Sequence, residues 1–384
     1  MILRGARVAM SATKFERLDV GIRGAKIVTL DAIRGAHGID LSGHVILPGL
    51  INAHDHLEFN LFPRLGRGPW PNATEWARKV YRPEESPVRE HRQVPRRVRL
   101  YWGGLKNLIS GATTVCHHNP YEPRMFGSRF PVRVVRDFGW AHSLAFSPDL
   151  RGRFRQTPRT WPFVIHAGES SDESAAAELR ELDATGTLGK RTALIHAVGL
   201  KPDDWQMLRR RGAAVISCPN SNLFSLGTTL SRSAFRSGVP IALGTDSAIT
   251  APGDLLDELR VAQKTWKLSP SSLYTMVTET AASILRLTDG RGEIREDGAA
   301  DLIVLRDTGK TPGETLLVTR RIEVAVIAGK IRLANARFAP RGFEQLHVQG
   351  RGTFCVDAKV GALYRAATAI VGEPLRLAGK RVRV

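Results

Sequence analysis

Four short apolar runs in the chain end at or just before side chains that could bind a metal ion. These side chains are His54 with His56, His166, His196 and Asp246. Neutral imidazoles and carboxylates are common ligands of Zn²⁺ and related divalent cations. Any one of them could instead bond a backbone carbonyl or cap a helix, but five such groups after four runs favour a shared metal centre.

The spacing within two of these motifs adds detail. His54 and His56 lie two residues apart, so in a strand both imidazoles point to the same face. Glu169 follows His166 by three residues and supplies a further carboxylate at that strand end. The sequence therefore predicts metal ligands together with a group suited to acid–base chemistry.

Such residues need a scaffold that brings the ends of separate strands together. Residues 49–298 alternate short apolar runs, most with a β-branched residue, with segments of helical periodicity. Strands that alternate with helices predict parallel βα units, and about 250 residues of this pattern suit a (β/α)8 barrel. The active site of such a barrel lies at the carboxyl ends of its strands. We therefore expect the metal centre at that end of the barrel.

Both ends of the chain have a different sequence pattern, with short strand-like runs bounded by Gly, Asp and Lys. We expect residues 1–48 and 299–350 to form one small, discontinuous β-sandwich domain beside the barrel. Residues 351–384 are basic and include a candidate helix near 359–369. They are expected to form a C-terminal extension, and their role stays open.

Composition limits the class of protein. The chain has 384 residues, of which 42% are hydrophobic and 24% charged, an ordinary globular balance. No apolar run approaches the ~20 residues that span a bilayer, and no signal-peptide core precedes the first motif. Three widely spaced cysteines fit no disulfide framework. A cytoplasmic protein without a membrane partner is therefore expected.

The net charge of +19 is unusual, but the 56 basic residues are spread over the whole chain. No nucleic-acid-binding motif accompanies them, so no specific nucleic-acid partner is expected. The charge mildly favours an anionic small-molecule substrate. A non-catalytic scaffold with a basic interaction surface is the alternative that this composition leaves open.

Several motifs resemble those of one enzyme superfamily. The segment 48–56, Pro-Gly-Leu-Ile-Asn-Ala-His-Asp-His, resembles the entry motif of the amidohydrolase superfamily, and the later ligand residues follow in that family's order. The segment from His166 to Glu169 is similar to the His-x-x-Glu motif of its deaminases, and 217–222 resembles their Cys-Pro-x-Ser-Asn turn. The most similar branch holds cytosine, guanine and adenosine deaminases and triazine hydrolases. The resemblance covers about residues 1–335.

The resemblance implies one divalent metal ion. Two-metal members usually bridge their ions with a carboxylated lysine, and this chain has no lysine between Lys106 and Lys190. The implied ligands are His54, His56, His166 and Asp246. Zn²⁺ is the expected ion, with iron as the second choice.

The resemblance also implies roles in catalysis. A metal-activated hydroxide is expected to attack an sp² carbon that bears nitrogen. Asp246 would take the water's proton, Glu169 would protonate the leaving group, and His196 would steady the oxyanion. Deamination of a heterocyclic or amidine-like small molecule is favoured. Hydrolysis of a cyclic amide, as in imidazolonepropionase, is the alternative.

Substrate contacts are expected from residues outside these motifs. His118 should point into the barrel, where it could donate to a substrate carbonyl or carboxylate or instead bond to the backbone. Asn222 should follow the seventh strand. Trp70 belongs to segment 57–82, an irregular loop that could close over the barrel mouth. The loop aromatics could instead pack the loop or contact a second subunit, so a homodimer stays open.

One segment is short compared with the family that the sequence resembles. Residues 119–163 must hold strands three and four with little room for their helices, and segments 120–131 and 151–162 look like loops. We therefore expect a barrel that is compressed around strands three and four.

Overall fold

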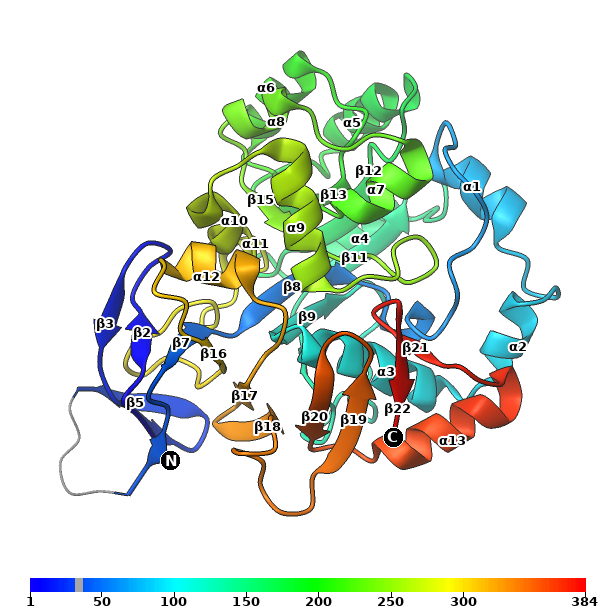
Figure 1. The fold of residues 1–384 in the computed structure, drawn as a ribbon. Helices are drawn as coiled ribbons and strands as arrows, with labels where there is room; N and C mark the ends of the chain where they lie inside the picture. The colour runs from blue at the N-terminus through cyan, green and yellow to red at the C-terminus, as the bar shows by residue number, and fades with distance from the viewer. Residues whose placement is uncertain (32–36) are drawn as a thin grey trace.

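Eight strands, β8 to β15, form the centre of the computed structural model, which describes residues 1–31 and 37–384. Helices surround them on one side of the molecule, and a β-rich region occupies the other (Figure 1). The central strands are β8 (Leu50–Asp55), β9 (Ala112–His117), β10 (Arg133–Val134), β11 (Gly139–Ser143), β12 (Phe163–Ala167), β13 (Thr192–His196), β14 (Ala214–Ser217) and β15 (Ile241–Leu243).

The central strands pair in parallel, in two sheets. One has the order β10-β9-β8 and the other β11-β12-β13-β14-β15. The sheets meet where β8 approaches β15, through a parallel bridge between Asp55 and Asp246 and a hydrogen bond of 2.8 Å from the Thr245 amide to the His54 carbonyl. Among the described residues no backbone ladder joins β10 to β11. The carboxyl ends of the strands therefore gather at one end of an α/β core.

Apolar side chains explain why these strands stay together. Every residue of β8, β9, β12 and β13 is buried, as expected for strands that are covered on both faces. An inner cluster draws on six of the eight strands and on α11 (Glu279–Ile284). Its members include Ile51, Ala53, Cys116, Val164, Ile195, Ile216, Ala242 and Ala281.

The surrounding helices begin and end at recognisable signals. Before α9 (Leu255–Trp266), the Asp254 carboxylate accepts hydrogen bonds from the amides of Leu256 and Asp257. The last residue of α6 (Pro202–Arg211) precedes Gly212, whose φ of 71° ends the helix in the left-handed region. The other helices around the strands are α3 (Arg96–Ile109), α5 (Ser174–Ala184), α7 (Pro219–Leu226), α8 (Arg232–Arg236) and α10 (Pro270–Met276).

The segment around the third and fourth strands is shortened, as the sequence indicates. Only residues 135–138 separate β10 from β11, and no helix lies between them. The expectation that 151–162 forms a loop is partly wrong, because α4 spans Leu150–Gln156. The Asp149 side chain caps this helix by accepting from the Gly152 amide. Only Leu150 of this helix is buried, and its sequence shows little apolar periodicity. For this reason the sequence does not predict a helix here.

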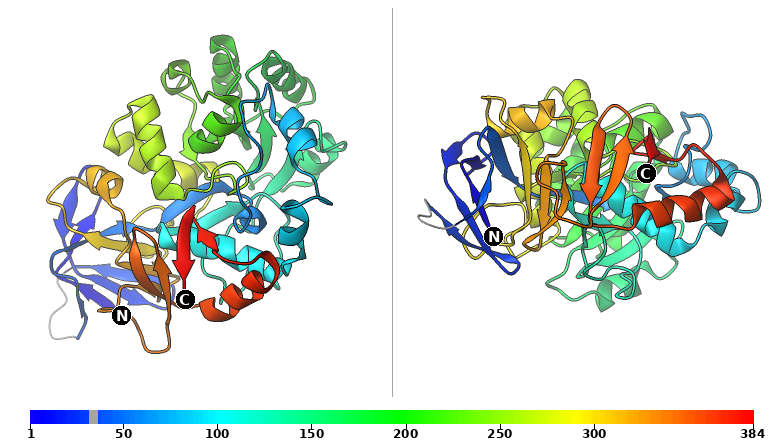
Figure 2. Two further views of the ribbon diagram at one scale, coloured as in Figure 1. Left: turned by 45° about the vertical axis from the view of Figure 1, so that its right-hand side comes forward. Right: turned by 60° about the horizontal axis from the view of Figure 1, so that its bottom comes forward.

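The two ends of the chain meet in one ten-stranded sheet, with the order β21-β22-β19-β20-β18-β17-β16-β7-β2-β3 (Figure 2). A smaller sheet has the order β5-β4-β1-β6. The N-terminal strands are β1 (Ile2–Arg4), β2 (Arg7–Ala9), β3 (Phe15–Arg17), β4 (Val20–Arg23), β5 (Lys26–Leu30), β6 (Ile39–Asp40) and β7 (His44–Pro48). The C-terminal strands are β16 (Leu302–Arg306), β17 (Val324–Ile327), β18 (Lys330–Ala334), β19 (Glu344–Val348), β20 (Gly352–Val356), β21 (Arg376–Leu377) and β22 (Lys380–Arg383).

The division into domains stays a prediction, and residues 32–36 of its first segment lie outside the described residues. The boundary expected at 350/351 falls in the turn between β19 and β20, so the C-terminal extension continues the sheet. Helix α12 (Pro312–Val318) lies between β16 and β17, and α13 (Val360–Val371) lies in the extension, at the position of the candidate helix. No helix in the described part of the chain has the length and apolar character to span a membrane.

Candidate metal centre

Three histidines and one aspartate converge at the carboxyl ends of β8, β12 and β15. The Nε2 atom of His166 lies 3.3 Å from that of His54 and 3.4 Å from that of His56. Asp246 Oδ1 lies 3.7 Å from the Nε2 atoms of His54 and of His56. All four residues are buried. The structure thus brings together the four side chains that the sequence predicts as ligands. Candidate ligand atoms form two overlapping groups within 4.8 Å, one of His54, His56 and Asp246 and one of His54, His166 and His196.

The spacing and protonation of these groups fit a divalent ion. A tetrahedral ion that binds nitrogen at about 2.0–2.1 Å holds two ligand atoms roughly 3.3–3.4 Å apart. The His166 Nδ1 atom donates to the His142 carbonyl at 2.7 Å, which leaves a lone pair on its Nε2. Burial lowers the pKa of His54 to about 3 and holds the pKa of His166 well below its ordinary value. Both imidazoles are therefore neutral and able to bind a metal.

One carboxylate oxygen of Asp246 faces the histidine cluster, and the other accepts hydrogen bonds from neighbouring hydroxyl groups. Its Oδ2 accepts hydrogen bonds from the hydroxyls of Ser221 at 2.6 Å and Thr250 at 2.9 Å. Burial alone would raise the pKa of Asp246. The nearby imidazoles of His54, His196 and His56 outweigh that effect, so the pKa lies well below its usual range. Asp246 is therefore an anion whose Oδ1 is available to a cation.

Several residues at the site have an unusual backbone conformation. His196, Ala197 and Asp246 have φ values of 73°, 53° and 55°, in the left-handed region that side chains other than glycine rarely adopt. Such strain is concentrated at functional sites. Gly244 permits a close approach of β15 to β8, since a Cβ atom there would lie 2.7 Å from the Cβ atom of His54.

Glu169 and His196 form a second pair beside the ligands. Glu169 Oε2 lies 3.5 Å from His196 Nε2, and burial raises the pKa of Glu169 to about 7. His196 Nδ1 donates to Asn222 Oδ1 at 2.7 Å, which turns Nε2 towards Glu169. The Gly168 amide donates to Glu178 at 2.7 Å and so fixes the turn before Glu169. Glu169 can therefore hold a proton near neutral pH.

A cavity of about 700 Å³ opens above these groups. His56, His166, Glu169, His196 and Asp246 line its inner end. The rest of the lining mixes polar and charged side chains with aromatic and apolar ones, the latter including Phe59, Trp76, Tyr81, Phe146 and Ile249. Part of this wall comes from α1 (Ala73–Val80), which follows the 3-10 turn η1 (Leu57–Phe59) and precedes α2 (Val88–Gln93). The cavity therefore joins the polar cluster to a wall that includes several aromatic side chains.

The structure does not place the three sequence-predicted substrate contacts in the wall of this cavity. Trp70 packs its ring 5.9 Å from that of Phe224, so the packing alternative describes it better, and Trp76 from the same segment lines the cavity instead. The Asn222 amide is used to hold His196. His118 is buried, with its ring centroid 4.3 Å from that of His166, and its Nε2 donates to the Ala141 carbonyl at 3.0 Å.

Sequence reasoning missed one residue at the site, His142, and the contact that Ser221 makes there with Asp246. His142, at the end of β11, lines the cavity and accepts the His166 hydrogen bond through its carbonyl. Its strand is short and irregular, but a histidine after Gly-Trp-Ala is the signal that could have found it. Ser221 belongs to the 217–222 turn, yet its bond to Asp246 depends on a contact that spacing does not reveal.

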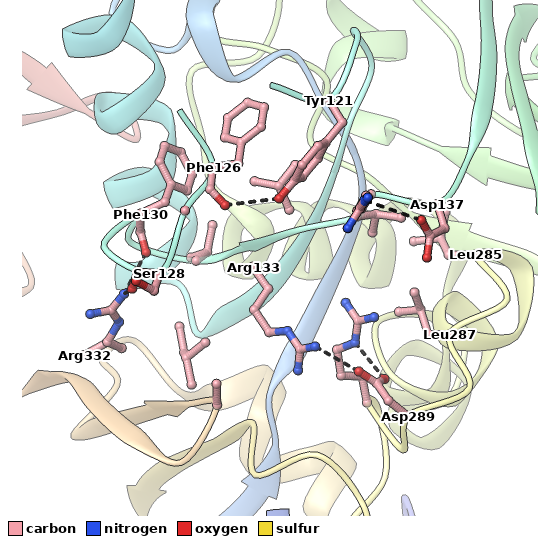
Figure 3. A pocket seen from close by; sticks show the side chains of 18 of the residues that line it. Tyr121, Phe126, Ser128, Phe130, Arg133, Asp137, Leu285, Leu287, Asp289 and Arg332 are labelled. Carbon is pink, nitrogen blue, oxygen red and sulfur yellow. Dashed lines mark hydrogen bonds and ion pairs between the residues drawn. The ribbon is translucent and has the colours of Figure 1, made fainter. Parts of the chain in front are cut away.

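A second cavity, of about 550 Å³, lies beside β10 and the short link that follows it, and Figure 3 shows the side chains that line it. Its guanidinium groups are already paired. Arg133 binds Asp289 at 2.9 Å and Asp301 at 3.2 Å, and Arg291 binds the same Asp289 at 2.8 Å. None of the sequence-predicted site residues lines it. We assign it no chemistry.

Comparison with known proteins agrees with this site. A family model described as "Amidohydrolase family" matches residues 160–332, which hold His166, Glu169, His196 and Asp246. The matched region therefore covers the part of the chain that holds four of the site residues. This match and the deaminase names of the relatives below identify the chain as a hydrolase of carbon–nitrogen bonds other than peptide bonds.

Several proteins that this chain resembles are named as deaminases. A 5-methylthioadenosine/S-adenosylhomocysteine deaminase from Syntrophobacter fumaroxidans is 27% identical over 71% of this chain and 74% of its own length. A second deaminase of that name, from Archaeoglobus fulgidus, is 26% identical over 82% of this chain and 89% of its own length.

Solved structures of the family share the fold. An adenosine deaminase from Xanthomonas campestris with bound zinc superposes with a TM-score of 0.75 at 18% identity, over 96% of this chain and 97% of that one. Atrazine chlorohydrolase from Arthrobacter aurescens, complexed with zinc, gives a TM-score of 0.74 at 19% identity, over 96% and 99%. At these identities the likeness establishes the fold alone.

Proposed function

We propose that this amidohydrolase is a metal-dependent deaminase that removes an amino group from an aminated heteroaromatic small molecule. The observation that carries the proposal is the position of Glu169. Its carboxyl group has a pKa raised to about 7, lies 3.5 Å from His196, and lines the same cavity as the ligand cluster. A site with this arrangement can deliver a proton to a leaving amine.

We assign the metal to His54, His56, His166 and Asp246, and we propose Zn²⁺ as the ion. When bound, the ion lowers the pKa of a water molecule and so supplies the nucleophile at neutral pH. The zinc-bound structures of related fold support this choice. We further propose that β8 to β15 form the closed (β/α)8 barrel of these proteins.

Side chains of this protein carry out the proton transfers and stabilise the developing charge. Asp246, an anion held by two hydroxyls, accepts the proton of the attacking water. Glu169 passes a proton to the ring nitrogen or the departing amine. His196 presents Nε2 to the cavity because Asn222 fixes its Nδ1, and when protonated it stabilises the developing oxyanion.

The cavity supports a flat, partly apolar substrate. Its volume of about 700 Å³ and its aromatic wall suit a nucleoside-sized molecule. The names of the relatives point to adenosine derivatives, and we propose this class as the first to be tested.

The test is release of ammonia by metal-loaded protein from a panel of aminated purines, pyrimidines and triazines, with cyclic amides alongside. We expect ammonia from at least one aminated heterocycle, and its loss in Glu169→Gln. Ring opening of a cyclic amide without ammonia would replace deamination by cyclic amide hydrolysis. Absence of bound metal together with absence of turnover would favour a non-catalytic scaffold.

A further inference from the structure

Polar side chains that no step above uses lie next to the histidine cluster. Asp55, which stands between His54 and His56, is fully buried, and Lys106 of α3 is 1% exposed. Lysine and aspartate are almost never buried without a partner. We refer to the following set as the buried polar network: Asn52, Asp55, Asn60, Lys106, Asn107 and Thr245.

The carboxylate of Asp55 is fully occupied. Its Oδ1 accepts from Asn60 at 2.7 Å, and its Oδ2 accepts from Asn107 at 2.8 Å and from the Thr245 hydroxyl at 3.1 Å. The Lys106 ammonium lies 3.3 Å from the same Oδ2. A carboxylate with this many partners is held in one position, and it cannot also turn towards a metal ion.

Lys106 has as many partners as it has hydrogens. Its Nζ atom donates to Asn60 Oδ1 at 2.8 Å and to Thr245 Oγ1 at 3.0 Å, with Asp55 as the third neighbour. An ammonium group has three donors, so it is satisfied without water. The ion pair is therefore part of a closed arrangement that ties α3 to the ends of β8 and β15.

Three of the four proposed ligands are chain neighbours of this network. Asp55 separates His54 from His56, and Thr245 precedes Asp246. Asn52 adds a direct link between the strands, because its Oδ1 accepts from the Thr245 amide at 3.1 Å. His166 stands on β12 and has no neighbour in the network. The network therefore controls the position of the ligands from β8 and β15 relative to one another.

We propose that the buried polar network is a positioning device that sets the metal affinity of the centre. The Lys106–Asp55 pair holds β8 against β15, so that the ligand atoms of His54, His56 and Asp246 keep separations that suit one ion. This inference rests on the proposed function, since it needs a metal at the cluster. Loss of groups that orient metal ligands typically weakens metal binding about 10–100-fold.

A purely structural role predicts a different result. Replacing a buried ion pair by apolar groups is often neutral for folding, whereas removing one partner destabilises the fold wherever the pair lies. Metal affinity separates these possibilities. Only an ion pair that contacts β8 or β15, the strands that hold the proposed ligands, should change the metal affinity.

The test compares two network variants with two matched controls. Lys106→Met removes the ammonium, and Thr245→Val removes the hydroxyl that contacts Lys106 and Asp55. Arg351→Met is the control for the first, because Arg351 is 3% exposed at its side chain and binds buried Asp254 at 3.0 Å. Thr113→Val is the control for the second, since the buried Thr113 hydroxyl has no partner among the described residues.

Zinc affinity is measured by competition with a chromophoric chelator, together with the visible spectrum of the Co²⁺ form and thermal unfolding of the metal-free protein. We expect zinc binding to weaken about 10–100-fold in Lys106→Met, and to weaken in Thr245→Val, each with an altered Co²⁺ spectrum. Arg351→Met should lower the unfolding temperature and leave zinc affinity unchanged, and Thr113→Val should leave zinc affinity unchanged.

Wild-type zinc affinity and an unaltered Co²⁺ spectrum in both network variants would overturn the positioning role, even if they unfold at lower temperature. If Lys106→Met does not fold, Thr245→Val decides the question. A wild-type protein that binds no zinc would instead overturn the proposed function, so the two failures are distinct.

Discussion

At the scale of single residues, the proton on Glu169 is central to the proposed chemistry. Glu169→Gln keeps the size of the side chain but removes the acid. Because general acid–base catalysis contributes about 10²–10⁴-fold, we expect kcat to fall by at least ~100-fold. Metal content, measured by elemental analysis, should stay at the wild-type level, since Glu169 is not among the proposed ligands. Turnover at the wild-type rate would remove Glu169 from the mechanism.

The same residue predicts a pH dependence. Burial raises the pKa of Glu169 to about 7, so the acid form is present below that pH and is lost above it. A general acid acts in its protonated form, and kcat/KM should therefore decline as pH rises through about 7. A profile of kcat/KM between pH 5 and 9 checks this. A profile that keeps rising to pH 9 would contradict the assignment.

Much of the site can be read from single residues, and some of it cannot. The proposed ligands and Glu169 each follow an apolar run. This local pattern can be recognised in the sequence alone. Lys106 could not be found in this way, because it lies within a helical segment and its role depends on a contact with Asp55, 51 positions away. His118 illustrates a choice that the sequence leaves open, since a position after a strand does not reveal whether the ring contacts a substrate or, as the structure has it, a backbone carbonyl.

At the scale of elements, helix α1 contributes a wall of the cavity. Trp76 lines the cavity, and its buried Nε1 has no hydrogen-bond partner among the described residues, so a substrate could accept from it. Trp70, by contrast, packs on Phe224. We expect Trp76→Ala to raise KM with a smaller effect on kcat, measured by steady-state kinetics.

Trp70→Ala is the comparison for that variant. It removes ring packing outside the cavity, so it should lower the unfolding temperature and leave KM near the wild-type value. The reverse pattern, in which Trp70→Ala changes KM and Trp76→Ala does not, would show that α1 is wrongly assigned as the wall.

The periodic elements were predictable and the irregular ones were not. Strands β8, β9, β12 and β13 and helices α6 and α9 follow strong apolar patterns and clear capping signals. Helix α4 escaped because it is rich in arginine and buries one residue fully. Helix α1 has no buried residue, so the aromatic segment around it looked like a loop. Both helices bury too few side chains to leave the apolar periodicity by which a helix is predicted.

At the scale of the whole molecule, metal removal should affect both activity and stability. Dialysis against a chelator should abolish turnover, and added Zn²⁺ should restore it. A ligand that binds only the folded protein stabilises it by about 2.7 kcal/mol at 100 times its Kd, so Zn²⁺ should raise the unfolding temperature. Differential scanning calorimetry of the metal-free and metal-loaded protein measures this. An unchanged unfolding temperature would argue against tight binding at the cluster.

The C-terminal residues 351–384 make contacts that tie them to the rest of the fold. Strand β20 pairs with β19 over five residue pairs, and the Trp102 indole of α3 donates to the Arg376 carbonyl at 2.8 Å. Ending the chain after residue 350 would leave β19 without that partner and expose the surface beneath α13. We expect aggregation or loss of a cooperative unfolding transition, measured by circular dichroism during heating. Wild-type unfolding in the truncated chain would show that the extension is dispensable.

The net charge of +19 is a property of the whole molecule that does not describe its cavity. The cavity lining has four carboxylates, Glu75, Glu169, Glu178 and Asp246, and one arginine, Arg78. The lining therefore gives no support to an anionic substrate, which the overall charge had mildly favoured.

The pairing of β7 with β16 has a consequence for the making of the protein. Their ladder joins residues such as Ile46 and Val304, which lie more than 250 positions apart. At about 5–20 residues per second, a ribosome needs roughly 13–50 s to synthesise the intervening chain. Throughout that time β7, an interior strand of the finished sheet, has no β16 to cover one of its edges. Molecular chaperones that shield exposed strands should therefore raise the yield of folded protein, most of all when translation is slow.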